Sequence, residues 1–105
     1  GYSIYESSET GITARTTMFA DAAQPVKVVR VQLKNESKER KRISATYIAD
    51  LVLSSSNQPQ RGRITAHYNA DNSAVFAHNG IEQDFPRPTT FLGATEEAIA
   101  YVLHR

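Results

Sequence analysis

A chain of 105 residues, 40% of them hydrophobic and 22% charged, has the length and composition of one small globular domain. Twelve Lys and Arg against eleven Asp and Glu give a net charge of +1, so bulk charge gives no reason to expect nucleic acid as a partner. The absence of cysteine excludes a disulfide scaffold, a zinc site with thiolate ligands and a thiol nucleophile, and it fits a cytoplasmic location.

The first residues alternate in polarity as short strands do. Residues 2–6 and 12–19 are each predicted to be a strand, and the turn between them, residues 7–11, contains the flexible Gly11. Residues 21–25 are predicted to be a loop. It ends in Pro25, directly before the next strand, where a missing N–H is tolerated best.

Two further segments with a period of two follow, residues 26–33 and 43–53, separated by the polar run 35–41. In the first, Val29, Val31 and Leu33 share one face, and in the second the alternate residues from Ile43 to Leu53 do. This pattern predicts an antiparallel pair with one buried face. The polar run carries a basic cluster interrupted by glutamates, which we interpret as a solvated hairpin end: Lys38, Arg40, Lys41 and Arg42.

The second half of the chain predicts a hairpin between two loops. Residues 54–60 are a loop, residues 63–69 and 74–78 are strands, and the tight turn 70–73 joins them through Asp, Asn and Ser. Residues 79–88 are a second long loop, and residues 89–92 are extended. Residues 96–103 fit either a short helix or a last strand.

About seven short strands at hairpin spacing predict an all-β fold, an antiparallel β-sandwich with at most one short C-terminal helix. We interpret residues 1–105 as one module and as a portion of a longer protein, since the chain opens on Gly1 and runs directly into strand-like sequence. This fold requires Val31 and Leu33 to be largely buried. The predicted core is Val29, Val31, Leu33, Ile43, Ala45, Tyr47, Leu51, Ile64 and Tyr68.

The sequence lacks a serine nucleophile elbow, a Walker loop, a dinucleotide fingerprint and a His-Glu-x-x-His motif, so no catalytic residue and no cofactor are expected. The acidic residues show no pair predicted to converge on one pocket. His67 and His78 fall on neighbouring predicted strands with Asp71 in the turn. Outward polar side chains explain them better than a metal site does, and no metal is expected.

Aromatic residues raise a sugar-stacking hypothesis. An aromatic residue in a strand is more often a core residue than a ligand platform, because these residues favour strands for packing reasons. The core interpretation is therefore preferred for the four tyrosines considered, which are Tyr5, Tyr47, Tyr68 and Tyr101.

Several stretches resemble a known family. The opening GYSIYE, the segment PVKVVR beginning at Pro25, ISATY at residues 43–47, AVFAHN at 74–79 and TFL at 90–92 carry the resemblance. Together they resemble the N-terminal β-sandwich module of glycoside hydrolase family 94, formerly glycosyltransferase family 36. Within that family the chain is most similar to the phosphorylase-like part of cyclic β-1,2-glucan synthase.

The resemblance implies a portion of a galactose-mutarotase-like supersandwich from a bacterial glucan-processing enzyme. In such enzymes the catalytic acid and the phosphate or acceptor site belong to a separate (α/α)₆ barrel. The resemblance thus implies a non-catalytic module that packs on the barrel of its own parent chain and borders the sugar cleft. It places the module on the cytoplasmic side, with an inner-membrane protein considered as the parent and no membrane contact by the module itself.

The second long loop is the predicted carbohydrate-binding site, because loops at the end of a sandwich project from a rigid scaffold. Its candidate groups are Asn79 as donor and acceptor, Asp84 for hydroxyl contacts, Phe85 for stacking and Arg87 as a fork donor. The expected ligand is a β-linked glucan oligosaccharide. The alternative is a purely structural packing module without a ligand, in which Phe85 and two prolines dock this loop.

Overall fold

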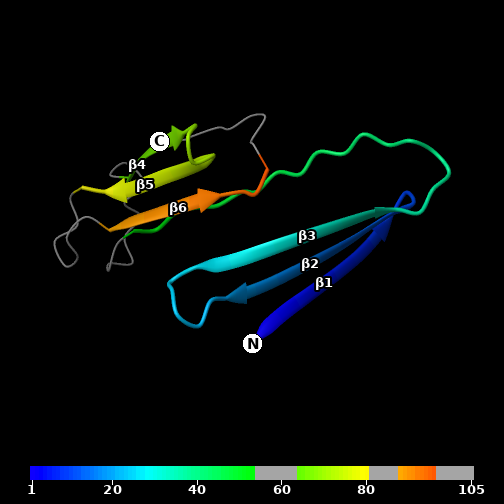
Figure 1. Cartoon of the computed structure of the whole chain (residues 1–105), viewed down its shortest axis with the longest axis horizontal. Helices are drawn as coiled ribbons and strands as arrows, with labels where there is room; N and C mark the ends of the chain where they lie inside the picture. The colour runs from blue at the N-terminus through cyan, green and yellow to red at the C-terminus, as the bar shows by residue number, and fades with distance from the viewer. Residues whose placement is uncertain (54–63, 81–87, 97–105) are drawn as a thin grey trace. The chain divides into compact units, whose positions relative to one another are not determined.

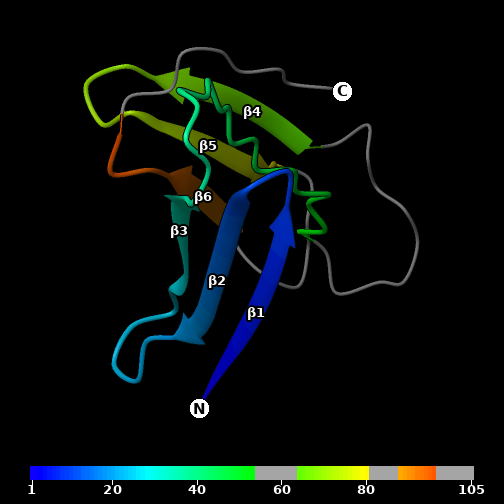
Figure 2. The same cartoon turned by 90° about the vertical axis from the view of Figure 1, so that its right-hand side faces the viewer.

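The computed structural model describes residues 1–53, 64–80 and 88–96. The chain divides into two compact units, Gly1–Thr46 and Tyr47–Arg105, and each contains one three-stranded antiparallel sheet (Figures 1 and 2). The predicted all-β fold is confirmed, and the described residues include no helix. Most of residues 96–103, for which a short helix or a last strand was predicted, lies outside the described ranges.

The first sheet, here called the N-sheet, has the strand order β1-β2-β3. Its strands are β1 (Tyr2–Glu9), β2 (Ile12–Ala20) and β3 (Lys27–Asn35). Thr10 and Gly11 have φ angles of 50° and 77° between the paired ends of β1 and β2. A two-residue turn with both φ angles positive matches the twist of an antiparallel hairpin, so β1 continues to Glu9 instead of ending at the predicted turn 7–11.

An aspartate organises the turn between β2 and β3. The Asp21 carboxylate accepts hydrogen bonds from the backbone N–H groups of Ala23 (2.8 Å) and Gln24 (2.9 Å). The Asp21 N–H donates to the carbonyl of Val26 at 2.8 Å. This local bonding closes the loop and leaves Pro25 just before β3, as predicted.

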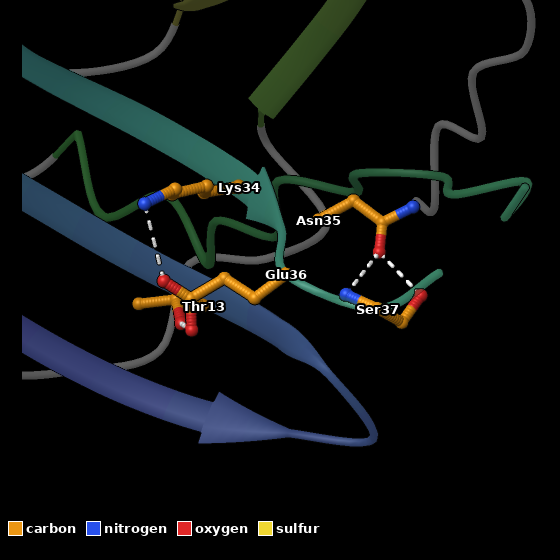
Figure 3. Close-up of polar contacts among 5 residues, drawn as sticks. All are labelled: Thr13, Lys34, Asn35, Glu36 and Ser37. Atoms are coloured by element: carbon orange, nitrogen blue, oxygen red, sulfur yellow. Dashed lines mark hydrogen bonds and ion pairs between the residues drawn. The ribbon is translucent and has the colours of Figure 1, made fainter. Parts of the chain in front are cut away.

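The predicted pairing of residues 26–33 with residues 43–53 is wrong. β3 pairs with β2, and residues 40–53 have no regular secondary structure. The Asn35 side-chain oxygen accepts from the N–H and hydroxyl of Ser37 at 3.0 and 2.6 Å (Figure 3). The Asn35 side-chain amide donates to the Glu39 carbonyl at 2.8 Å. The N–H of Glu36 donates to the Gly11 carbonyl at 2.8 Å. These bonds direct the chain toward the β1–β2 turn, so the polar run does not make a hairpin.

The second sheet, the C-sheet, has the order β4-β5-β6, with β4 (Ile64–Asn69), β5 (Ala74–Asn79) and β6 (Thr89–Gly93). The tight turn predicted between β4 and β5 is confirmed. The Asn69 side-chain oxygen accepts from the N–H of Asn72 at 3.0 Å, and Ser73 adopts a φ of 48°. A short polar side chain that bonds to the backbone two or three residues on stabilises such a turn.

The predicted core is wrong in its most important members. Val31 and Leu33 are 50% and 45% exposed, and Ile43, Ala45 and Tyr47 are also exposed. Val29, Leu51, Ile64 and Tyr68 are half-buried. Among the described residues, the fully buried ones all belong to β5: Ala74, Ala77 and Asn79.

Candidate functional site

The N-sheet is amphipathic, with an exposed aliphatic face. The register sets Met18 opposite Val29, Thr16 opposite Val31 and Ala14 opposite Leu33. Directly opposed residues in an antiparallel sheet project from the same face, and alternate residues of each strand join them. This face also contains Ser3, Ser7, Glu9, Ala20, Lys27 and Asn35. Its central part, called here the aliphatic face, comprises Tyr5, Ile12, Ala14, Thr16, Met18, Val29, Val31 and Leu33.

The opposite face of the N-sheet is mostly polar and carries ion pairs. Arg15 Nε lies 3.5 Å from Glu6 Oε1, between directly opposed residues of β1 and β2. Near the end of β3, Lys34 Nζ lies 3.3 Å from Glu36 Oε1, and the Thr13 hydroxyl donates to Glu36 Oε2 at 3.3 Å (Figure 3). Solvent screens such exposed pairs, so the part of this face around them is suited to water. The same face also exposes the apolar side chains of Tyr2, Ile4 and Phe19.

The basic cluster predicted from the sequence lines an open hollow of about 450 Å³, bounded by Arg40, Lys41 and Arg42. The Lys41 ammonium donates to the carbonyl of Thr10 in the β1–β2 turn. Lys41 therefore joins the segment after β3 to that turn. The interpretation of this cluster as a hairpin end is wrong, because residues 40–53 contain no strand that pairs with β3.

Three aromatic rings form a row across one face of the C-sheet. His67 of β4 is opposite Phe76 of β5, which is opposite Phe91 of β6. The His67 and Phe76 ring centroids are 5.8 Å apart with the planes inclined by 21°, and those of Phe76 and Phe91 are 6.3 Å apart at 39°. We call these residues the ring row. Phe91 is 51% exposed and His67 is also exposed, so the row presents ring surface to solvent.

The ring row is flanked by small and uncharged polar residues. Two ladder positions away on the same face lie Thr65, His78 and Thr89 on one side, and Asn69, Ala74 and Gly93 on the other. Ala74 and Gly93 add no bulk beside the rings. The nine described residues of this face therefore combine three rings with hydroxyl, amide and imidazole groups, and none of them is Lys, Arg, Asp or Glu.

His67 and His78 lie on neighbouring strands, as predicted, but they are two ladder positions apart. His67 is opposite Phe76, whereas His78 is opposite Thr65. Within residues 1–53, 64–80 and 88–96, no group of three His, Asp or Glu side chains is arranged to hold a metal ion. The ring contact of His67 with Phe76 shows that this imidazole is part of an aromatic surface.

The predicted carbohydrate site lies mainly outside the described residues. Asp84, Phe85 and Arg87 belong to residues 81–87, which the structure leaves undescribed. Asn79 is described and is 0% exposed; its side-chain amide donates to the Leu53 carbonyl at 2.9 Å, and its N–H donates to the Pro88 carbonyl at 3.1 Å. Asn79 thus connects β5 to two neighbouring segments, and in this conformation its side chain is inaccessible to a ligand.

The ring row was not predicted from the sequence: the tyrosines were considered as a stacking platform with a core role preferred, and Phe85 was the predicted stacking residue. The pairing of His67 with Phe76 could have been predicted from the turn at residues 70–73. Counting outward from both ends of that turn places residue 67 opposite residue 76. The position of Phe91 carries no such signal, since the long segment between β5 and β6 leaves their register open. Of the tyrosines, Tyr5 and Tyr47 are exposed, Tyr68 is half-buried and Tyr101 lies outside the described ranges.

Comparison with known proteins identifies the family of this chain. The family model described as "Glycosyl hydrolase 94, supersandwich domain" matches residues 1–105, the whole chain. Neither the curated proteins nor the solved structures yield a significant match. In the part of the chain that the structure describes, no helix has the length and apolar character needed to cross a membrane.

Proposed function

We propose a docking role for this chain, which belongs to the glycosyl hydrolase 94 supersandwich domain family. In this proposal it is a non-catalytic module that docks on the catalytic (α/α)₆ barrel of its parent enzyme. The observation that carries the proposal is the exposed aliphatic face of the N-sheet. Val31, Leu33 and Tyr5 are each 45% to 59% exposed on that face. A contiguous apolar sheet face in water is typical of a surface that another protein layer covers.

The contrast between the two faces of the N-sheet supports docking by one side. The polar face has Arg15 and Glu6 paired across β1 and β2, and Lys34 paired with Glu36. The aliphatic face has Val29, Val31 and Leu33 in alternate positions of β3. Antiparallel sheets commonly have one face in water and one against a protein core, which is the arrangement proposed for this module in its parent.

The resemblance of the sequence to the phosphorylase-like part of cyclic β-1,2-glucan synthase supports a bacterial glucan-processing parent. The parent is then a glycosyltransferase or glycoside phosphorylase whose chemistry occurs on the barrel, and this module borders its sugar cleft. The purely structural alternative has the same docking and no sugar contact. The two differ in whether the module responds to a glucan oligosaccharide.

Docking is tested by mixing the 105-residue chain with the separately produced (α/α)₆ barrel of a family 94 phosphorylase and measuring association by sedimentation velocity. Val31→Ser and Leu33→Ser together should abolish association, because they place hydroxyl groups in the middle of the aliphatic face. Gln32→Ser is the matched control, since Gln32 lies between them on β3 and projects from the polar face. Equal association of the unmodified chain, the double variant and Gln32→Ser with the barrel would contradict the proposal.

The predicted contact through the loop at residues 79–88 is tested by chemical-shift mapping with β-1,2-linked glucooligosaccharides. Shifts at Asp84, Phe85 and Arg87 at millimolar sugar would support glucan contact by this loop. The burial of Asn79 means that its response should be indirect and smaller. If Asn79, Asp84 and Phe85 do not shift, this loop has no binding role.

A further inference from the structure

We propose that the ring row of His67, Phe76 and Phe91 on the C-sheet is a binding surface for a neutral oligosaccharide, and that it is distinct from the loop predicted from the sequence. The three rings are aligned across three adjacent strands, with successive centroids 5.8 and 6.3 Å apart. They form a continuous apolar strip on a rigid sheet. The choice of a β-linked glucan as the sugar rests on the proposed function.

The chemistry of the ring row matches one side of a pyranose chain. A pyranose ring exposes C–H groups, which carry small positive charges and pack favourably against the negative π-system of an aromatic ring. The hydroxyl groups at its rim need hydrogen-bond partners beside that apolar strip. Thr65 and His78 provide hydroxyl and imidazole groups two ladder positions away on the same face.

Because none of the nine described residues of this face is Lys, Arg, Asp or Glu, the face favours a neutral ligand over a charged one. Single-stranded nucleic acid also stacks on aromatic rings, but its binding requires cations that follow the phosphates. None of the nine described residues of this face is Lys or Arg. A neutral sugar carries no charge, so it requires no charged side chain on the surface that binds it.

The same face is poorly suited to docking of a protein layer. Apart from Ala74, its nine described residues include no aliphatic side chain, whereas the aliphatic face of the N-sheet contains Ile12, Met18, Val29, Val31 and Leu33. A surface of rings beside hydroxyl, amide and imidazole groups is typical of a site that orients a polar ligand with an apolar face. The two sheets therefore present surfaces for two classes of partner.

The test is a titration of the isotope-labelled 105-residue chain with β-1,2-linked glucotetraose, followed through the backbone amides and the aromatic ring signals. We expect saturable shifts at the rings of His67, Phe76 and Phe91 at millimolar sugar. Phe91→Leu, which keeps an apolar side chain but removes the ring, should weaken binding by about fivefold to tenfold. Phe91→Tyr keeps the ring and should bind within about twofold of the unmodified chain.

A control variant and a competing ligand separate this proposal from its alternatives. Leu33→Ser on the N-sheet should bind sugar unchanged, so a failure of barrel docking is distinguishable from a failure of sugar binding. Shifts confined to residues 81–87, equal binding by Phe91→Leu and the unmodified chain, or no saturable shift at the ring row would each overturn the proposal. Tighter binding of a single-stranded oligonucleotide than of glucotetraose at the ring row would overturn the assignment to a neutral sugar.

Discussion

The two sheets have the same architecture, three antiparallel strands in sequential order, but they are stabilised in different ways. The N-sheet has no fully buried residue. Side-chain hydrogen bonds of Asp21, Asn35 and Ser37 fix the backbone at the ends of its strands. The C-sheet buries Ala77 and Asn79 on one face of β5 and presents the ring row on the other. Sheet topology alone therefore indicates neither where the stability lies nor which face meets a partner.

The largest predicted effect is the removal of the buried amide of the C-sheet. Asn79→Ala should destabilise the chain by about 2 to 3 kcal/mol, because the Leu53 carbonyl loses its partner and a small cavity forms beside β5. Urea unfolding measures the loss. Asn72→Ala is the matched control at an exposed turn position, and its effect should be well under half as large. Equal stability of Asn79→Ala and the unmodified chain would remove the structural role assigned to Asn79.

The next effect is expected at the β1–β2 turn of the N-sheet. Gly11 has a φ of +77°, and a Cβ placed there would lie 2.8 Å from the Cβ of Ser37. Gly11→Val should destabilise the N-sheet by about 2 kcal/mol, through backbone strain and this steric conflict. Gly80→Ala is the control, since among the described residues no atom beyond its chain neighbours lies within 4 Å of the Cβ that it adds. Amide hydrogen exchange of β1 and β2 shows whether the loss is local.

A smaller effect is predicted for the aliphatic face. Leu33→Ser in the free chain should change the free energy of unfolding by about 0.5 kcal/mol or less, because nearly half of the Leu33 side chain is already in water. Thermal unfolding of the 105-residue chain measures this change. A loss of several kcal/mol would mean that Leu33 is a core residue and that the aliphatic face is covered within the chain itself.

The smallest effect is predicted for the pH dependence of the β2–β3 turn. Hydrogen bonds from the backbone N–H groups of Ala23 and Gln24 lower the pKa of Asp21 from its ordinary value of 3.8. Because the folded state favours the carboxylate, its contribution is present above pH 3.8 and is lost as the pH falls through the lowered folded pKa. The difference in the free energy of unfolding between the unmodified chain and Asp21→Asn should therefore become smaller below pH 3.8. A difference that is constant from pH 7 to pH 2 would contradict this role.

Several elements were predictable because their signals are local. The alternation in residues 12–19, the position of Pro25 before β3 and the polar turn between β4 and β5 each depend on a few consecutive residues. Turn chemistry and a period of two determine such elements without reference to the rest of the fold. The same alternation in residues 43–53 was misleading. That segment forms no strand, because a period of two makes a strand only where its backbone groups enter a hydrogen-bonded ladder.

The sequence by itself determined the all-β class and the family resemblance. It also predicted the six strands that the described residues contain. These results depend on local pattern and on residue identity at successive positions. Only the tertiary structure decided which apolar residues are covered. The register of β2 with β3 places Val31 and Leu33 on an exposed face, and the hydrogen bond from Asn79 to Leu53 joins residues 26 positions apart. The alignment of His67, Phe76 and Phe91 was decided in the same way. Strand register and burial are set by contacts between distant segments, and a chain's local pattern does not encode those contacts.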